Sequence, residues 1–505
     1  MSGAARELDE RDVVLVGVGA AQRDRRGYDG PAVEPVDLMA EAARAALDDS
    51  GTSADALVGA IGMVAVPEGN WAYTDPGRLV AERLGLHAAR TVLVQIGVPQ
   101  STPLRVAAER IRAGELEAAL VVGGEAKATQ QRLTRAGDAP PETDQSGAEP
   151  DERWAPQGEL MAEPEITAGI WDPVAQYACI ENALRVAEGC SLDRHLDEVA
   201  ALWAAFNRIA RTNPDAAFPA PLDEAQLRSA GEGNRPLAFP YAKWHSTQWG
   251  VDQAGALLLC SVATARAAGV PPERWVFPWA IVDSSDSVSL SRRAELHRWP
   301  AMAVLGDAVR AHLGRPVASI DHVELYSCFP AAVRVQQREL GLPVDGVPTV
   351  TGGMAFAGGP FNNFTYQATA AVVAAVRRER GSTGLVSTVS GLLTKPGLTV
   401  WSTEPGPRPP LVADLGAEAR AATEVREVTG DAHGQATVAT YTVTHQGADP
   451  LSAFVVADLP DGRRWVGTSS DDALLARGVG DGPELIGSTV RLDGATCVAS
   501  RPDRR

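Results

Sequence analysis

Cysteine is scarce in this sequence. Five cysteines occur among 505 residues, and none belongs to a Cys-x-x-Cys pair. This spacing provides neither the even framework of a disulfide-stapled domain nor the closely spaced ligands of a zinc site. We therefore expect no metal centre and a reducing compartment, and the cytoplasm is the predicted localisation.

Positive charge and long apolar runs are also in short supply. The 46 Lys and Arg residues are outnumbered by 64 Asp and Glu residues, which gives a formal net charge of −18. Such a surface repels nucleic acid and anionic lipid. No stretch reaches the ~18 apolar residues of a membrane span, and residues 1–12 are too acidic for a signal peptide. We expect a protein that acts on small molecules, with no nucleic acid and no membrane as partner.

Apolar residues nevertheless make up 45% of the chain, which is enough for a large core. One stretch predicts strands at 13–18, 91–96 and 119–122, and helices at 37–49 and 103–113. A later stretch predicts strands at 323–326 and 385–389, and helices at 331–340 and 365–380. Strand, helix and strand in this order favour an α/β fold with a largely parallel sheet. The similar order of elements in the two stretches indicates two related halves.

The regions between and after these halves differ from them in composition and in periodicity. Residues 127–165 are rich in Pro, Asp, Glu, Gln and Gly without a period, which predicts a long surface excursion. Helical spacing at 173–188 and 194–210 is interpreted as a cap inserted between the halves. Short strands at 435–445, 452–459, 464–468 and 488–492 predict a small C-terminal β-barrel of the OB type. The predicted domains are an N-terminal half at 1–125, a cap at 126–245, a C-terminal half at 246–414 and the barrel at 415–505.

Four motifs give the chain a resemblance to a known family. They are KWHSTQWGVDQAGAL at 243–257, YSCF at 326–329, GGPFNNF at 358–364 and GLLTKPG at 391–397. In this order they resemble the thiolase superfamily, in particular acetyl-CoA acetyltransferase-like proteins and sterol carrier protein-type thiolases with an extra C-terminal domain. The resemblance implies a duplicated five-layer αβαβα fold of two βαβαβ halves, with an inserted loop domain. It also implies an acyl-CoA substrate without a further cofactor, and a homodimer formed through a strand of the first half as the candidate assembly.

The sequence departs from this family where the chemistry of a thiolase is carried out. The bend at 95–103, which matches the position of the nucleophilic cysteine, reads QIGVPQSTP. The Gly-His-Pro motif is matched by GGP at 358–360, and the Cys-x-Gly motif by VSG at 389–391. Without a thiol at the helix N-terminus and a histidine to activate it, ordinary cysteine-dependent thiolysis is excluded.

The candidate catalytic residues are Tyr326, Cys328, His245 and Asn362. A phenol at the end of a strand can donate to a thioester oxygen or protonate an enolate, and an amide can bind an acyl carbonyl. Each residue also has a structural interpretation. For Tyr326 the alternative is packing in the sheet, and for Asn362 it is a tight turn. Packing is the favoured interpretation of Cys328, and a structural role is the favoured interpretation of His245.

The candidate substrate-binding residues come from the same motifs and bends. They are Ser101, Thr102, Ser327, Gly358, Gly359, Asn363, Ser390 and Lys395. A hydroxyl needs an adjacent base, which the matching position Gly359 does not supply, so an N-cap is the alternative role for Ser101 or Thr102. Lys395 is placed to meet a phosphate of CoA, and a solvated surface lysine is its alternative.

The predicted function is that of an acyl-CoA-binding, thiolase-like acyltransferase or C–C bond lyase or ligase, such as a retro-aldolase. The most economical chemistry avoids a covalent acyl intermediate and stabilises a thioester enolate. The alternative is a catalytically inactive CoA-binding or scaffold protein, which the missing catalytic groups favour. The sequence leaves both hypotheses open.

Overall fold

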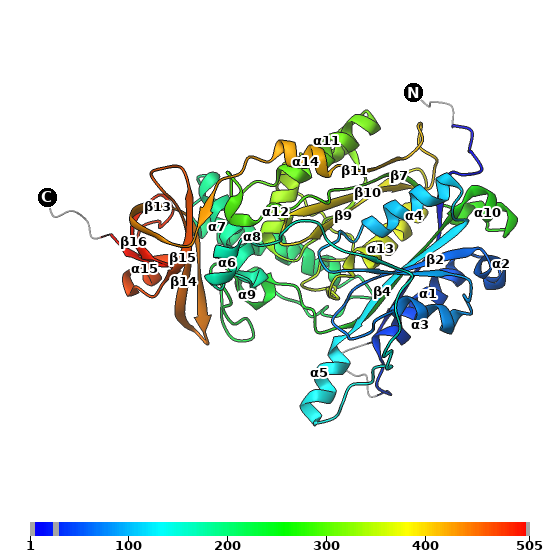
Figure 1. The fold of residues 1–505 in the computed structure, drawn as a ribbon, viewed down its shortest axis with the longest axis horizontal. Helices are drawn as coiled ribbons and strands as arrows, with labels where there is room; N and C mark the ends of the chain where they lie inside the picture. The colour runs from blue at the N-terminus through cyan, green and yellow to red at the C-terminus, as the bar shows by residue number, and fades with distance from the viewer. Residues whose placement is uncertain (1–5, 24–29, 501–505) are drawn as a thin grey trace.

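The computed structural model describes residues 6–23 and 30–500. Figure 1 shows an elongated molecule in which two α/β halves pack side by side and a β-barrel lies at the opposite end. The N-terminal half is at the right, the C-terminal half in the middle, and the barrel at the left. Among the described residues, no helix is both long enough and apolar enough to traverse a bilayer.

The first sheet has the strand order β1-β6-β4-β2-β3-β5. Its strands are β1 (Val13–Gln22), β2 (Ile61–Pro67), β3 (Arg90–Val94), β4 (Ala118–Ala126), β5 (Glu152–Trp154) and β6 (Asp252–Ser261). Strand β6 lies between β1 and β4 and is antiparallel to both. The predicted start of the second half at residue 246 is therefore wrong, because β6 completes the first sheet. The whole cap separates β6 from β4 in the sequence, so a local pattern does not reveal which sheet the strand joins.

The second sheet repeats the topology of the first. Its strands are β7 (Phe277–Asp283), β8 (His322–Glu324), β9 (Thr383–Ser390), β10 (Lys395–Ser402) and β11 (Leu411–Asp414). The order β7-β10-β9-β8 reproduces β1-β6-β4-β2, with β10 antiparallel to both neighbours as β6 is. The duplication predicted from the sequence is confirmed, although each sheet is mixed rather than largely parallel.

Two helices form the layer between the sheets. They are α4 (Thr102–Ala113) and α13 (Phe364–Arg378), and each contacts strands of both sheets. The outer layers contain α1 (Pro35–Asp49), α2 (Ala54–Val58), α3 (Pro76–Leu84), α10 (Val262–Ala267), α11 (Pro300–Leu313), α12 (Pro330–Glu339) and α14 (Gly416–Ala422). Alanine-rich sequences suit the middle layer, because a helix packed on two sides needs small side chains. The N-termini of α4 and α13 both follow bends that hold candidate site residues.

The cap is inserted between β4 and β6. It contains α5 (Lys127–Ala136), α6 (Glu163–Thr167), α7 (Pro173–Ala187), α8 (Leu192–Ala210) and α9 (Glu224–Arg228). The surface excursion predicted at 127–165 contains helix α5, whose residues are mostly exposed or half-buried. Its residues are good helix formers, but most of them are polar, and only Thr129 is buried.

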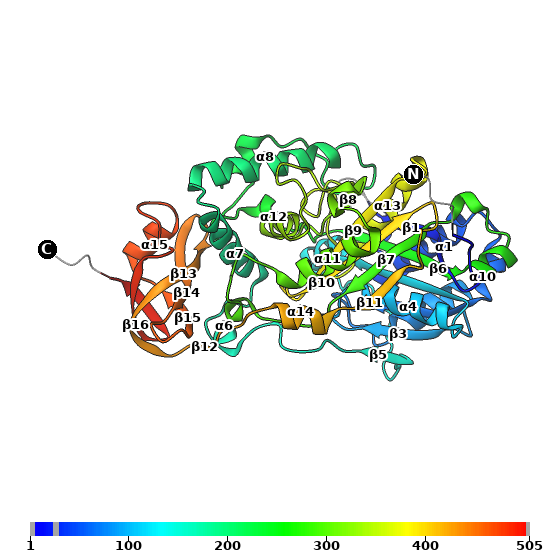
Figure 2. The same ribbon diagram turned by 90° about the horizontal axis from the view of Figure 1, so that it is seen from above.

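The C-terminal domain is a closed β-barrel. Its strands are β13 (Ala432–Gln446), β14 (Asp449–Asp458), β15 (Arg464–Ser469), β16 (Thr489–Gly494) and β17 (Thr496–Ala499), with β12 (Val428–Thr429) beside β15 and helix α15 (Asp472–Gly478) after it. The predicted strands are all present, and the parallel pairing of β15 with β17 closes the barrel. Figure 2 shows the barrel packed against α7 of the cap, which in turn contacts α12.

A candidate acyl-binding cavity

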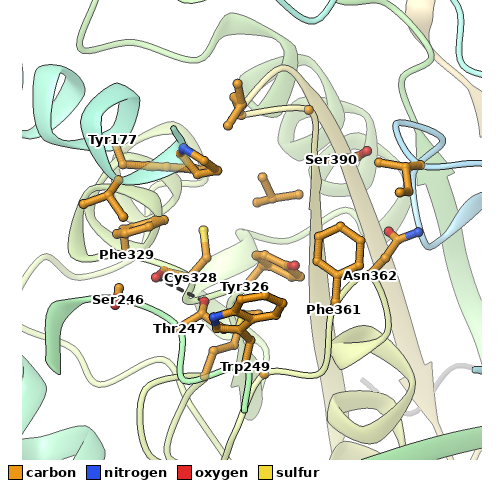
Figure 3. Close-up of a pocket in the computed structure, with 18 of the residues that line it drawn as sticks. Tyr177, Ser246, Thr247, Trp249, Tyr326, Cys328, Phe329, Phe361, Asn362 and Ser390 are labelled. Carbon is orange, nitrogen blue, oxygen red and sulfur yellow. Dashed lines mark hydrogen bonds between the residues drawn. The ribbon is translucent and has the colours of Figure 1, made fainter. Parts of the chain in front are cut away.

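A cavity of about 560 Å³ lies where the two halves meet the cap. Its walls come from segments at 96–100, 172–177, 246–249, 326–329, 359–362 and 389–392. Helix α7 and the bends before α4 and α13 therefore face one another across it. Motifs spread over three hundred residues of sequence converge on a single space, as Figure 3 shows.

Aromatic and aliphatic side chains form most of the surface. The ring of Tyr177 stacks on Phe329 with centroids 4.6 Å apart, and Tyr241 stacks on Phe329 at 5.5 Å. Trp249 and Phe361 also line the cavity, yet they remain 45% and 39% exposed, so they mark its open side. Such walls suit an apolar group that enters from solvent.

Tyr326 lines the cavity, as the sequence predicted. Its backbone N–H donates to Oγ of Ser387 at 2.8 Å, and Nε2 of Gln336 donates to its carbonyl at 2.9 Å. Its ring meets Phe364 edge-on, with centroids 6.0 Å apart. Burial raises the pKa of Tyr326 well above its ordinary value. The phenol therefore stays protonated at neutral pH, and the side chain of Gln100 is its hydrogen-bond partner.

Cys328 also lines the cavity, but its environment does not activate the thiol. Burial raises the pKa of Cys328 to about 12. A nucleophilic cysteine requires the opposite, a pKa lowered by a cation or a helix N-terminus. Its carbonyl accepts hydrogen bonds from the backbone N–H and Oγ1 of Thr247, at 3.0 and 3.3 Å. These hydrogen bonds join the wall at 246–249 to the wall at 326–329.

His245 lies close in sequence to the cavity but does not line it. The ring is buried beside Tyr241, and Nδ1 accepts a hydrogen bond from the backbone N–H of Ala242 at 3.1 Å. Burial lowers the pKa of His245 to about 4, so the imidazole is neutral. This arrangement corresponds to the structural histidine that was the alternative role.

Asn362 lines the cavity in a left-handed backbone conformation, with φ of 52°. Its Nδ2 donates to the carbonyl of Glu68 at 2.9 Å. Its Oδ1 faces Nε2 of Gln100 at 3.5 Å. An asparagine held in this region is a sign of a constrained site. The side chain is thus already used to join the bend before α13 to the first half.

Gln100 is a cavity residue that the sequence candidates did not include. It precedes α4, and its Oε1 accepts a hydrogen bond from the backbone N–H of Thr365 at 3.1 Å, at the start of α13. Its own carbonyl accepts from the hydroxyl of Tyr366 at 3.1 Å. The sequence could have identified Gln100 as a candidate, because it lies in the bend at 95–103, which matches the position of the family's nucleophile.

The remaining candidates divide into two groups. Gly359 and Ser390 line the cavity. The others lie outside its lining: Ser101, Thr102, Ser327, Gly358, Asn363 and Lys395. Gly358 faces Gln253 in a smaller cavity, and Asn363 is the N-cap residue of α13. The folded bends therefore bring two of the predicted substrate-binding residues to the cavity and leave the other six outside its lining.

Three of the outlying residues have structural partners. Oγ1 of Thr102 donates to Asp283 at 2.7 Å, and Oγ of Ser327 accepts from the backbone N–H of Met354 at 3.0 Å. Nζ of Lys395 donates to the carbonyls of Gly97 and Gln157, at 3.1 and 2.6 Å. Burial lowers the pKa of Lys395. This lysine supports the cavity wall at Gly97 from behind and is not a solvated surface cation.

The chemistry available in the cavity is limited to hydrogen bonding and apolar contact. Among the described residues that line it, Asp172 is the only ionisable group of the Asp, Glu, His, Lys and Arg types. Its Oδ1 caps α7 by accepting from the N–H of Val174 at 3.0 Å. Within the described part of the chain no group of three His, Cys, Asp or Glu side chains is arranged to hold a metal ion.

Comparisons with known proteins agree with this architecture. Residues 417–495 match the family model described as the thiolase-like protein type 1 additional C-terminal domain. The crystal structure of a monomeric SCP2-thiolase like protein type 1 from Mycobacterium smegmatis is 28% identical, with a TM-score of 0.82 over 98% of this chain and 100% of that chain. No curated protein sequence matches the chain.

More distant structures share the fold of the two halves. A structure titled Ltp2-ChsH2(DUF35) aldolase has a TM-score of 0.57 at 18% identity, over 78% of this chain and 98% of that one. The dimeric peroxisomal thiolase of Saccharomyces cerevisiae has a TM-score of 0.55 at 17% identity, over 79% and 99%. At these identities the likeness shows the thiolase fold alone.

Proposed function

For this thiolase-like chain, which carries the type 1 additional C-terminal domain, we propose the binding of a CoA thioester with its apolar acyl group in the cavity. The protein acts on this thioester through noncovalent contacts, without an acyl-enzyme. The thioester is the substrate, and no further cofactor takes part.

The observation that carries this proposal is the convergence of the thiolase-like motifs on one apolar space. The volume of about 560 Å³ is in the range of small-molecule sites, which is roughly 300–1,000 Å³. Aromatic walls at Tyr177 and Phe329 favour an acyl chain over a charged headgroup. The thiolase bends supply the walls, while the groups that would form an acyl-enzyme are missing.

Tyr326 is the candidate catalytic residue. Its protonated phenol donates to the thioester carbonyl and stabilises the negative charge that develops there. In a retro-aldol step, a 3-hydroxyacyl thioester loses its hydroxyl proton to solvent and its Cα–Cβ bond breaks. The products are a carbonyl compound and a thioester enolate, which then takes up a proton at Cα. The same contacts serve the reverse, bond-forming direction.

A second candidate function is favoured by a specific observation. The described lining holds no carboxylate except the exposed Asp172, and the thiol of Cys328 is not activated. A protein with this cavity can bind an acyl-CoA without converting it. We retain an inactive acyl-CoA-binding protein as the alternative.

The test is product analysis by mass spectrometry after incubation with acyl-, 3-ketoacyl- and 3-hydroxyacyl-CoA thioesters, with and without free CoA. We expect conversion that does not require free CoA. Tyr326→Phe should lower the rate about 100-fold, as expected for loss of one oxyanion donor. Tyr73→Phe removes a buried phenol that binds Glu34 away from the cavity, and it should leave the rate unchanged.

Each other outcome decides between the hypotheses. Binding of a thioester without conversion supports the inactive alternative. The absence of both binding and conversion across the panel contradicts the proposal. Equal rates for Tyr326→Phe and the unaltered protein exclude the role given to this phenol.

A further inference from the structure

The cavity wall at 390–394 is a turn in an unfavourable backbone conformation. Gly391, Leu392 and Leu393 occupy the left-handed region in succession, with φ of 61°, 60° and 60°. Leucine rarely adopts this conformation because its Cβ approaches the following carbonyl. Gly391 and Leu392 line the cavity, so the shape of the cavity depends on keeping this turn in place.

Side chains from elsewhere hold the carbonyl groups of this turn. An amino group of the Arg293 guanidinium donates to the carbonyls of Leu392 and Leu393, at 3.2 and 2.7 Å. The indole of Trp299 donates to the carbonyl of Thr394 at 3.1 Å. Arg293 is almost completely buried, so its position is set by the segment that carries it.

Arg293 belongs to the segment 291–294, which is held by hydrogen bonds from the C-terminal barrel. Arg464 on β15 donates through one amino group to the carbonyls of Ser291 and Arg293, and through the other to Ala294 at 3.3 Å. Its Nε donates to Asp458 on β14 at 2.8 Å, which fixes the guanidinium from the barrel side. Arg464 is only 1% exposed.

The chain that leads into the barrel holds the same segment from another side. The N–H of Ala294 donates to the carbonyl of Glu424 at 3.0 Å, and the N–H of Arg426 donates to the carbonyl of Arg292 at 2.8 Å. The segment 291–294 is therefore enclosed between the barrel and the cavity turn. This gives a continuous series of hydrogen bonds from β15 to the cavity wall.

A second contact joins the barrel to the opposite wall. Asn182 on α7 donates to the carbonyls of Tyr441 on β13 and Phe239, at 3.0 and 3.2 Å. Tyr177, nearer the start of the same helix, lines the cavity. Figure 2 shows α7 beside β13 along the edge of the barrel. The barrel thus touches the supports of two walls.

We propose that the C-terminal barrel is an internal positioning domain for the cavity, and that Arg464 and Arg293 are its positioning residues. Arg464 fixes the segment 291–294, and Arg293 in turn fixes the left-handed turn at 390–394. The proposal concerns the shape of the cavity and does not rest on the proposed function. It assigns the barrel a role within its own chain.

The test is amide hydrogen exchange of the full-length protein, followed by mass spectrometry of peptides that cover 390–394. Arg464→Gln should accelerate exchange there about tenfold, because local opening becomes easier when the supporting bonds are lost. Arg463→Gln is the matched control, since the neighbouring Arg463 side chain is 42% exposed and pairs with Asp461. It should leave this exchange unchanged. Arg293→Lys should accelerate exchange at 390–394 while peptides from 435–446 stay protected.

Unchanged exchange at 390–394 in a folded Arg464→Gln protein overturns the proposal. Equal acceleration by Arg463→Gln overturns it as well, because the effect is then a general loss of barrel stability. If Arg464→Gln fails to fold, Arg464→Lys takes its place with the same readout, since lysine keeps the charge but cannot span all the carbonyls. These results do not depend on thioester binding, so failure of the proposed function would be seen separately.

Discussion

At the scale of single residues, burial controls protonation in and around the cavity more than neighbouring charge does. It raises the pKa of Tyr326 and of Cys328, and it lowers the pKa of His245 to about 4. All three groups are therefore neutral at pH 7. The sequence identifies these residue types, but the charge state of each follows from the surroundings that folding creates.

The first prediction concerns the thiols. Cys328 should resist iodoacetamide in the folded protein at pH 7.5, because with a pKa of about 12 only roughly one thiol in 10⁴ or fewer is ionised. Cys190 is partly exposed and should be modified first. Peptide mass mapping measures both rates, with protein unfolded in urea as the control in which they converge. Modification of Cys328 as fast as Cys190 in the folded state would show that the thiol is activated.

The second prediction concerns a buried carboxyl outside the cavity. Glu125 is 1% exposed, and its Oε1 accepts from the N–H of Asn70 at 2.7 Å. Burial raises the pKa of Glu125 from 4.5 to about 8. The folded state therefore holds the proton more tightly than the unfolded state, and this group makes stability fall as pH rises from about 4.5 to about 8.

Glu125→Gln removes this dependence. Relative to the unaltered protein, the variant should gain up to a few kcal/mol of unfolding free energy between pH 5 and pH 9. Urea denaturation at the two pH values measures the change. Glu149→Gln is the control, since Glu149 is an exposed partner of Arg153 and should show no such gain. A difference that does not depend on pH would contradict the assignment.

At the scale of elements, close packing depends on small residues and on side chains that join helix ends. Gly17 and Gly19 on β1 lie under α1, where an added Cβ would stand 1.9 Å from the carbonyl oxygens of Ala46 and Ala42. These glycines serve helix–strand packing. Gln100 links the starts of α4 and α13 in the middle layer.

The third prediction follows from this link. Gln100→Ala should lower the unfolding free energy by about 1–3 kcal/mol, because it leaves the buried N–H of Thr365 without its acceptor. Urea denaturation measures the loss. Gln130→Ala on the outlying helix α5 serves as the control and should cost far less. Equal losses in the two variants would show that the link between the helices contributes nothing.

At the scale of the whole molecule, a short strand of the cap covers one edge of the first sheet. The resemblance implied a homodimer through a strand of the first half. In this structure the edge of β3 is paired with β5 of the same chain, and the N–H of Gln95 continues the contact by donating to Trp154 at 2.9 Å. A strand whose edge is already paired does not offer that edge to a second chain.

The fourth prediction is therefore a monomer. Size-exclusion chromatography with light scattering should give the mass of one chain at micromolar concentration. Trp154→Pro removes a backbone donor on the side of β5 that faces β3, where the carbonyl of the same residue accepts from Gln95, and it should favour association or aggregation through the exposed edge of β3. Arg135→Pro near the end of α5 tests whether any proline in the cap has this effect. A stable dimer of the unaltered protein would contradict the prediction.

The sequence by itself determined the composition of the layers and the order of the motifs. Strands such as 13–18 were predictable from a short apolar run rich in β-branched residues, and the barrel strands from local alternation. The thiolase resemblance and the loss of the cysteine, histidine and Cys-x-Gly groups were also evident, because they depend on residue identity alone. At the three matching positions, those identities remove the groups that the resemblance assigns to ordinary thiolysis.

Only the tertiary structure decided which residues meet. It placed β6 in the first sheet, moved His245 and Lys395 behind the cavity wall, and added Gln100 to the lining. It also connected Arg464 to a turn that is distant in the sequence. These contacts join residues that lie far apart in the sequence and are brought together by long connections and bends. A local sequence pattern carries no signal of a contact with a distant segment.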